Sequence, residues 1–230
     1  MYLTSSDGWY SNSKIKFQPL FLLHYLKINP NSLIKILNEF NSNTTKIRIK
    51  NSLSTIGFID FLSERGVAIK DKQIHISSYN KIIIALAAVE CGADILTVCR
   101  LIDWRDFELF TSEIMKFHDY SVYKNYRIKN PTRQIDVVGI RGQNALVLDC
   151  KHWNRNSYSG MVSAVDKQIE RVTLFMKKKK SLGIEYSYPV IITFLPNEFR
   201  YVNQVPIVPI SSFNSFLIDF DNYKQNFIRI

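Results

Sequence analysis

The sequence predicts an α/β domain over residues 101–230, preceded by a mainly helical domain over residues 1–100. Two observations lead to this division. Up to about Leu101, apolar residues recur at three- and four-residue steps, which is typical of helices. After Trp104 the period changes, and the elements follow the order α-β-β-β-α-β-β-α, which indicates a mixed sheet flanked by helices.

The N-terminal part contains three expected helices followed by a hairpin. The helices begin near Phe17, Pro30 and Ser52, and the third ends at Gly66, a natural C-terminal cap. Two short alternating runs, at residues 67–69 and 73–77, then predict the hairpin. This order is that of a winged helix, although such units also serve in dimerisation or docking. Two buried helices are expected next, over residues 81–90 and 93–102.

The α/β part begins with a helix from Trp104 to about Phe117. Strand patterns follow, with Gly142 suited to a hairpin turn between the second and third strands. Pro206 and Pro209 cannot donate ladder hydrogen bonds, so the strand that contains them is expected at the sheet edge. The expected strands are 121–128, 134–140, 144–151, 188–195 and 205–210, and the further helices are 159–180 and 212–220.

The composition excludes several classes of protein. Apolar residues make up 46%, which excludes global disorder, and no apolar run approaches the ~18 residues of a membrane span. The N-terminus lacks the pattern of a signal peptide, so we expect a cytoplasmic protein. Three scattered cysteines are too few for a disulfide framework or a zinc site. The net charge of +10, spread over both halves, fits a polyanionic partner or a merely basic soluble protein.

The segment that carries chemistry lies on two neighbouring strands. Asp136 is on the first strand, and Asp149 and Lys151 are on the second. Because side chains alternate along a strand, Asp149 and Lys151 project to the same face and Cys150 to the other. Two ionised carboxylates in an apolar neighbourhood repel each other, and Mg²⁺ relieves this repulsion. The spacing therefore predicts a carboxylate, carboxylate and ammonium cluster that suits a divalent cation.

This pattern resembles a known nuclease signature. Asp136, thirteen positions before Asp149 and followed by Lys151, resembles the PD-(D/E)xK motif of the restriction-endonuclease-like nucleases. The segments 104–108, 120–122, 134–138 and 149–153 together resemble the Mrr-like and archaeal Holliday-junction-resolvase-like branches. The chain departs from the motif twice, since Ile135 replaces the proline and Asp149 stands where glutamate is commoner.

The resemblance implies a metal-dependent DNA endonuclease of restriction, repair or junction processing. It implies metal ligation by Asp136, Asp149 and the backbone carbonyl of Cys150, while Lys151 orients or deprotonates the attacking water. Glu108 matches a helical glutamate that reaches the metal in many members. Gln168 matches a polar active-site position on the following helix. The implied cofactor is Mg²⁺, which Mn²⁺ can replace. The implied partner is duplex or branched DNA, with no membrane, and a homodimer is expected by analogy.

Basic residues on both parts of the chain are candidates for DNA contacts. These are Lys46, Arg48, Lys50, Arg133, Arg155 and Arg171. A solvated edge strand explains residues 46–50 equally well, and a purely structural ion cluster could pair the two aspartates with Lys151 and Arg133. Two other functions also fit the sequence. The nuclease-like domain could be inactive and serve in DNA binding or assembly, or its substrate could be RNA.

Overall fold

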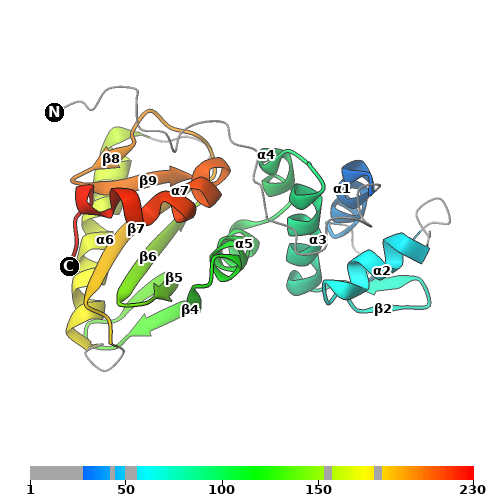
Figure 1. Ribbon diagram of the computed structural model, residues 1–230, viewed down its shortest axis with the longest axis horizontal. Helices are drawn as coiled ribbons and strands as arrows, with labels where there is room; N and C mark the ends of the chain where they lie inside the picture. Colours follow the sequence, from blue (N-terminus) through cyan, green and yellow to red (C-terminus); the bar gives the residue numbers. More distant parts are fainter. Residues whose placement is uncertain (1–27, 42–44, 50–55, 153–156, 179–182) are drawn as a thin grey trace. The chain divides into compact units, whose positions relative to one another are not determined.

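The computed structural model describes residues 28–41, 45–49, 56–152, 157–178 and 183–230 (Figure 1). The helix predicted from Phe17, and the basic residues Lys50 and Arg155, lie outside these residues. The chain divides into two compact units, one ending at Asp106 and the other comprising Phe107–Ile230. Within the described residues, no helix combines the length and apolar character needed to cross a membrane.

The first unit consists of short helices and a small antiparallel sheet of order β1-β3-β2. The helix predicted from Pro30 is confirmed, with Asn29 as its N-cap. Gly66 ends α2 at φ 84°, as its cap role predicts. The strand β1 pairs with the hairpin strand β3. In the described residues, two helices, α1 and α2, precede the hairpin. The predicted winged helix has three helices before its hairpin, so it stays a prediction. The elements are α1 (Pro30–Glu39), β1 (Lys46–Arg48), α2 (Ile56–Glu64), β2 (Ile69–Lys70), β3 (Gln73–His75), α3 (Ser78–Glu90) and α4 (Ile95–Cys99).

The second unit is built on a six-stranded mixed sheet of order β4-β5-β6-β7-β9-β8. The first three strands are antiparallel, and β6, β7 and β9 run parallel. This confirms the predicted fold class, since the architecture is consistent with the restriction-endonuclease-like fold. The helix α5 (Trp104–Phe117) begins in the last residues of the first unit and continues into the second. The other elements are β4 (Ser121–Ile128), β5 (Arg133–Arg141), β6 (Asn144–Lys151), α6 (Tyr158–Lys178), β7 (Tyr186–Thr193), β8 (Tyr201–Val202), β9 (Val205–Pro209), α7 (Ile210–Tyr223) and the 3-10 helix η3 (Lys224–Asn226).

The prediction that residues 205–210 form the edge strand was wrong. The strand β9 lies between β7 and the short strand β8, which pairs with it through Tyr201 and Val202. A two-residue strand carries no periodic signal, so β8 could not be seen in the sequence. Both prolines of β9 stand at paired positions, Pro206 opposite Tyr201 of β8 and Pro209 opposite Thr193 of β7 at the end of the strand.

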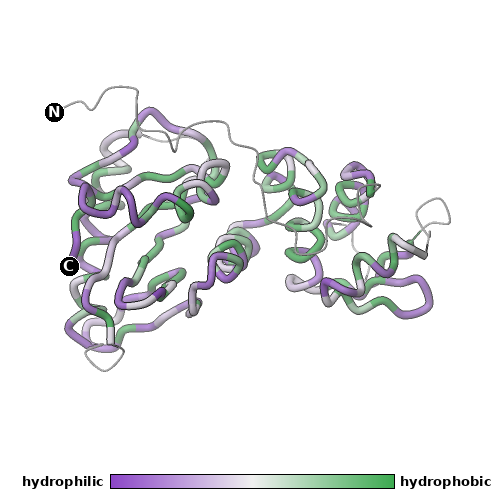
Figure 2. The backbone as a smooth tube through the Cα atoms, in the orientation of Figure 1, coloured by the Kyte–Doolittle hydropathy of each residue, from purple (hydrophilic) through white to green (hydrophobic). Residues whose placement is uncertain are grey.

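Helices cover both faces of the sheet. On β7, Ser187 and Ile191 face α6, where Ser187 contacts Met176 and Ile191 joins a cluster with Met161. Tyr188, of the opposite parity, packs edge to face on Phe220 of α7. The helix α7 therefore lies on the face opposite α6. Figure 2 shows the central strands as mainly hydrophobic, as expected for strands covered on both sides.

The hairpin of β5 and β6 positions the candidate site. Gly142 turns the chain at φ 58°, and Val137 pairs with Leu148 at the far end of the ladder. Continuing this register by one residue sets Asp136 opposite Asp149. The spacing of thirteen residues thus brings the two carboxylates to the same end of neighbouring strands.

Candidate active site

Asp136 lies at an irregularity in β5. Regular pairing with β4 skips Asn125 and Asp136, and Asn125 adopts a left-handed φ of 50°. On the other side, the pairing of β5 with β6 has already ended at Val137. In place of a backbone carbonyl, the Asp136 carboxylate accepts the backbone N–H of Cys150 at 2.8 Å. Such breaks in a ladder re-aim a side chain, here toward the strand that bears Asp149.

Asp149 is the most buried acid of the site, at 3% exposure. Its Oδ2 lies 2.8 Å from Nζ of Lys151, and its Oδ1 lies 3.1 Å from Nη1 of Arg171. The contact of Lys151 places its ammonium on the same face as Asp149, as strand alternation predicts. The contact is an ion pair without hydrogen-bond geometry, so Oδ2 is buried with no hydrogen bond from the described residues. A buried acceptor in this state has capacity for a further ligand.

Two side chains of α6, Gln168 and Arg171, hold Asp149 in place, Arg171 by direct contact and Gln168 through Arg171. Gln168 is fully buried, and its Nε2 donates to the backbone carbonyl of Val147 at 2.8 Å. Its Oε1 accepts from Nη1 of Arg171 at 3.3 Å, the same nitrogen that pairs with Asp149. The helical i, i+3 spacing predicted that these two residues share a face, but their partners were not predicted. Gln168 thus anchors α6 to β6 and helps to orient Arg171.

Gln168→Leu is expected to destabilise the protein by about 2 kcal/mol, because the buried Val147 carbonyl and the Arg171 guanidinium each lose a partner. The measurement is urea denaturation followed by circular dichroism. Gln134→Leu is the matched control, since this glutamine bonds Asn125 at an exposed position and is expected to change stability by less than about 0.5 kcal/mol. Equal effects of the two substitutions would contradict the anchoring role of Gln168.

The electrostatics of the site centre on Asp136. Burial raises the pKa of its carboxyl to about 6, and the neighbouring charge of Asp149 adds to the rise. The Cys150 N–H and the charges of Lys151 and Arg171 act in the opposite direction. The two carboxylates therefore interact strongly, and near neutral pH a modest change in local charge decides whether Asp136 holds a proton.

Glu108 lies on α5 and is buried at 8% exposure. Its charge helps to raise the pKa of the Cys150 thiol, after the effects of burial and of the two aspartates. Glu108 is therefore near Cys150, whose side chain alternates to the face opposite Asp149. The ring of His152 stacks on Phe194 at 4.6 Å, which fits a packing role.

The remaining basic candidates are not part of this cluster. Arg133 pairs with Glu170 at 2.7 Å, so the alternative in which Arg133 neutralises the aspartates is not what the structure contains. The arginine that pairs with Asp149 is Arg171, and this pairing depends on the packing of α6 against β6. Lys46 and Arg48 are exposed on β1 of the first unit. Their predicted DNA contacts stay predictions.

The donor set of the site suits Mg²⁺ in part. Among the residues that the structure describes, no group of three His, Cys, Asp or Glu side chains is assembled to hold a metal ion. Glu108 is thus not combined with both aspartates. Mg²⁺, however, commonly takes only one or two carboxylates and completes its shell with water and phosphate oxygens. The buried Asp149 Oδ2 and the high pKa of Asp136 both fit two carboxylates set to share a cation.

Comparison with protein families agrees with this geometry. Residues 104–194 match the family model described as NERD, nuclease-related domain. This segment is therefore similar to nuclease-related domains. Such domains belong to the restriction-endonuclease-like nuclease fold, and they indicate nuclease activity. The matched segment contains Asp136, Asp149 and Lys151 as well as Gln168 and Arg171 of α6. The narrower resemblance to Mrr-like or Holliday-junction-resolvase-like nucleases stays a prediction.

Individual relatives are distant. A stretch of 126 residues, 54% of this chain, is 25% identical to an uncharacterized protein of Archaeoglobus fulgidus and covers 96% of that protein. The crystal structure of protein VC1899 from Vibrio cholerae is similar at a TM-score of 0.38 and 9% identity, with 86% of this chain and 52% of that chain covered. Can2 from Sulfobacillus thermosulfidooxidans, solved with cyclic tetra-adenylate, is similar at a TM-score of 0.35 and 12% identity, with 84% and 51% covered. This chain spans about half the length of these two structures.

Proposed function

We propose that this chain is a divalent-metal-dependent nuclease that hydrolyses phosphodiester bonds in DNA at Asp136, Asp149 and Lys151. One observation carries the proposal. The two carboxylates meet at one end of β5 and β6, with an ammonium 2.8 Å from a buried Asp149 oxygen that accepts no hydrogen bond from the described residues. The similarity of the segment that contains these residues to nuclease-related domains supports the same reaction class.

Asp136, Asp149 and the backbone carbonyl of Cys150 would hold the cation. Mg²⁺ bound there would polarise a phosphate oxygen and lower the pKa of a bound water. Asp136 must be ionised to act as a ligand, which its pKa of about 6 permits near neutral pH. Lys151 would orient the attacking water and stabilise the negative charge that develops on the phosphate.

Arg171 has a supporting role in this proposal. Its pairing with Oδ1 of Asp149 fixes the carboxylate, while Oδ2 is buried beside the Lys151 ammonium and accepts no hydrogen bond from the described residues. Lys151 and Arg171 together balance the two aspartates, so the site becomes favourable for a cation chiefly when a phosphate adds its own negative charge. The exposed Lys46 and Arg48 of the first unit are assigned to backbone phosphates, and a homodimer would allow both strands to be cut.

The test is a cleavage screen with the purified chain, Mn²⁺ or Mg²⁺, and duplex, branched, nicked and single-stranded DNA beside matched RNA. We expect cleavage of at least one DNA form that leaves 5′-phosphate and 3′-hydroxyl ends and that stops in EDTA. Cleavage of RNA alone would replace the proposed substrate. DNA binding without cleavage of any substrate would instead indicate a binding or assembly protein.

A further inference from the structure

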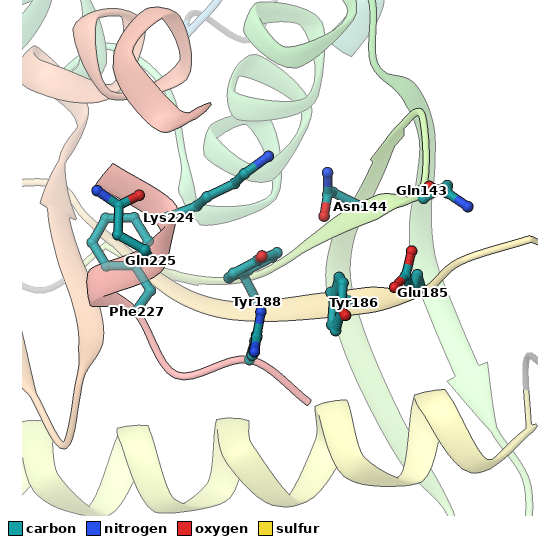
Figure 3. A pocket seen from close by; sticks show the side chains of 9 residues that line it. Gln143, Asn144, Glu185, Tyr186, Tyr188, Lys224, Gln225 and Phe227 are labelled. Atoms are coloured by element: carbon teal, nitrogen blue, oxygen red, sulfur yellow. The ribbon is translucent and has the colours of Figure 1, made fainter. Parts of the chain in front are cut away.

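A pocket of about 450 Å³ lies in the second unit, away from the aspartates (Figure 3). Asn144, at the start of β6, lines it and is five residues from Asp149, which corresponds to ~17 Å along the strand. The two residues also have opposite parity and therefore face opposite sides of the sheet. The pocket is thus distinct from the candidate active site. Its lining residues are Gln143, Asn144, Glu185, Tyr186, Tyr188, Lys224, Gln225, Phe227 and Arg229.

Backbone pairing builds the pocket wall. The chain beyond η3 runs beside β7, where Ser187 and Ile230 exchange two backbone hydrogen bonds of 2.9 and 3.0 Å. Ile228 adds a third bond to the carbonyl of Gln204, and Glu185 donates to the carbonyl of Gln143. Figure 3 shows the side chains of β7 between those of η3 on one side and those of the β5–β6 turn on the other. These backbone hydrogen bonds therefore hold in place the segments that carry the lining side chains.

The pocket combines a flat aromatic surface with positive charge. The Arg229 guanidinium lies 4.8 Å from the centre of the Tyr186 ring, and Arg229 makes no ion pair with any described residue. Tyr188 and Phe227 are buried beneath as an apolar floor. Lys224 shares Asp221 with Arg141, and neither of these two partners lines the pocket. Among the lining residues, two cations, Lys224 and Arg229, accompany one acid, Glu185. Tyrosine and arginine planes are surfaces on which a nucleobase stacks.

The pocket is also lined by side-chain amides, which can hydrogen-bond to a ligand. The amides of Gln143, Asn144 and Gln225 each offer both donors and acceptors, as the edges of nucleobases require. Lys224 and Arg229 supply charge for a phosphate. The volume lies within the range of small-molecule sites. We propose that this pocket binds a nucleotide, through stacking at Tyr186 and Arg229 and phosphate contact at Lys224 and Arg229. The site goes beyond the proposed nuclease function and does not depend on it.

The test is calorimetric titration of the full chain in EDTA. Because EDTA prevents metal-dependent cleavage, the titration measures nucleotide binding whether or not the chain is a nuclease. The probes are 5′-AMP, adenosine, inorganic phosphate and a 5′-phosphorylated deoxytetranucleotide. We expect 5′-AMP to bind at least tenfold more tightly than adenosine or phosphate. A tetranucleotide that binds at least tenfold more tightly than 5′-AMP would identify a strand end as the occupant, and otherwise the occupant is a free nucleotide.

Two substitutions assign the binding to this pocket. Arg229→Gln and Tyr186→Leu are each expected to weaken 5′-AMP binding at least fivefold, with circular dichroism unchanged. The affinity of Lys224→Gln for 5′-AMP is compared with that of Lys116→Gln, and only Lys224→Gln is expected to bind more weakly. Both lysines pair with an acid three residues earlier, at 2.8 and 2.7 Å, but only Lys224 lines the pocket. An affinity for 5′-AMP no greater than for phosphate, or less than a fivefold loss in folded Arg229→Gln and Tyr186→Leu, would overturn the proposal.

Discussion

Asp136→Asn is expected to lower the rate of metal-dependent cleavage by about 10³-fold while making the metal-free protein more stable at pH 8. The loss of rate follows because the amide keeps the acceptor for the Cys150 N–H but is a much poorer ligand for a cation. The gain in stability follows because a buried, charged carboxylate beside Asp149 is removed. Cleavage kinetics and thermal unfolding at pH 4 and pH 8 measure the two effects.

The pH dependence of this stability change has a definite sign. The folded pKa of about 6 lies above the model value of 3.8, so the folded protein retains a proton that the unfolded chain has released. The contribution of Asp136 to stability is therefore complete below pH 3.8 and is lost as the pH rises through 6. The difference between the two pKa values corresponds to on the order of 3 kcal/mol.

The stabilisation by Asp136→Asn is thus expected to be small at pH 4 and largest above pH 6. Asp166→Asn is the control, because Asp166 is exposed on α6 and is expected to change neither stability nor cleavage. A variant of Asp136 that cleaves at the wild-type rate, or that is equally stabilised at both pH values, would contradict the assignment.

Lys151→Met is expected to reduce the cleavage rate by about 10³-fold with little loss of nucleic-acid affinity. Methionine keeps the length of the side chain and removes the charge that lies 2.8 Å from Asp149 Oδ2. The fold is expected to persist because Asp149 keeps its pairing with Arg171 at 3.1 Å. Single-turnover cleavage and a binding titration separate the two readouts.

Lys167→Met provides the comparison for Lys151→Met, since Lys167 is exposed on α6 and outside the aspartate cluster. It is expected to retain the wild-type rate within about twofold. If the two variants cleaved equally well, Lys151 would have no part in the chemistry, and the cluster would be a structural ion network of the kind that the sequence also allowed.

Most of the second unit could be predicted because its elements carry strong local signals. The helix from Trp104 to Phe117 was located by periodicity, and the hairpin around Gly142 by its turn glycine and flanking strands. The first unit was predicted less completely, because its elements are short and its sheet depends on β1 pairing with β3 across a long separation in sequence. The order of strands at the far edge was missed for the same reason, since β8 has only two residues.

The amino-acid sequence by itself determined which residues could share the site. Alternation along β6 sets Asp149 and Lys151 on one face, and the hairpin register sets Asp136 beside Asp149, so three side chains follow from local geometry. The tertiary structure decided that Arg171 rather than Arg133 neutralises Asp149, and that the segment ending at Ile230 pairs with β7 to form the second pocket. Local periodicity fixes neighbours within a strand or hairpin, whereas contacts between distant segments depend on how whole elements pack.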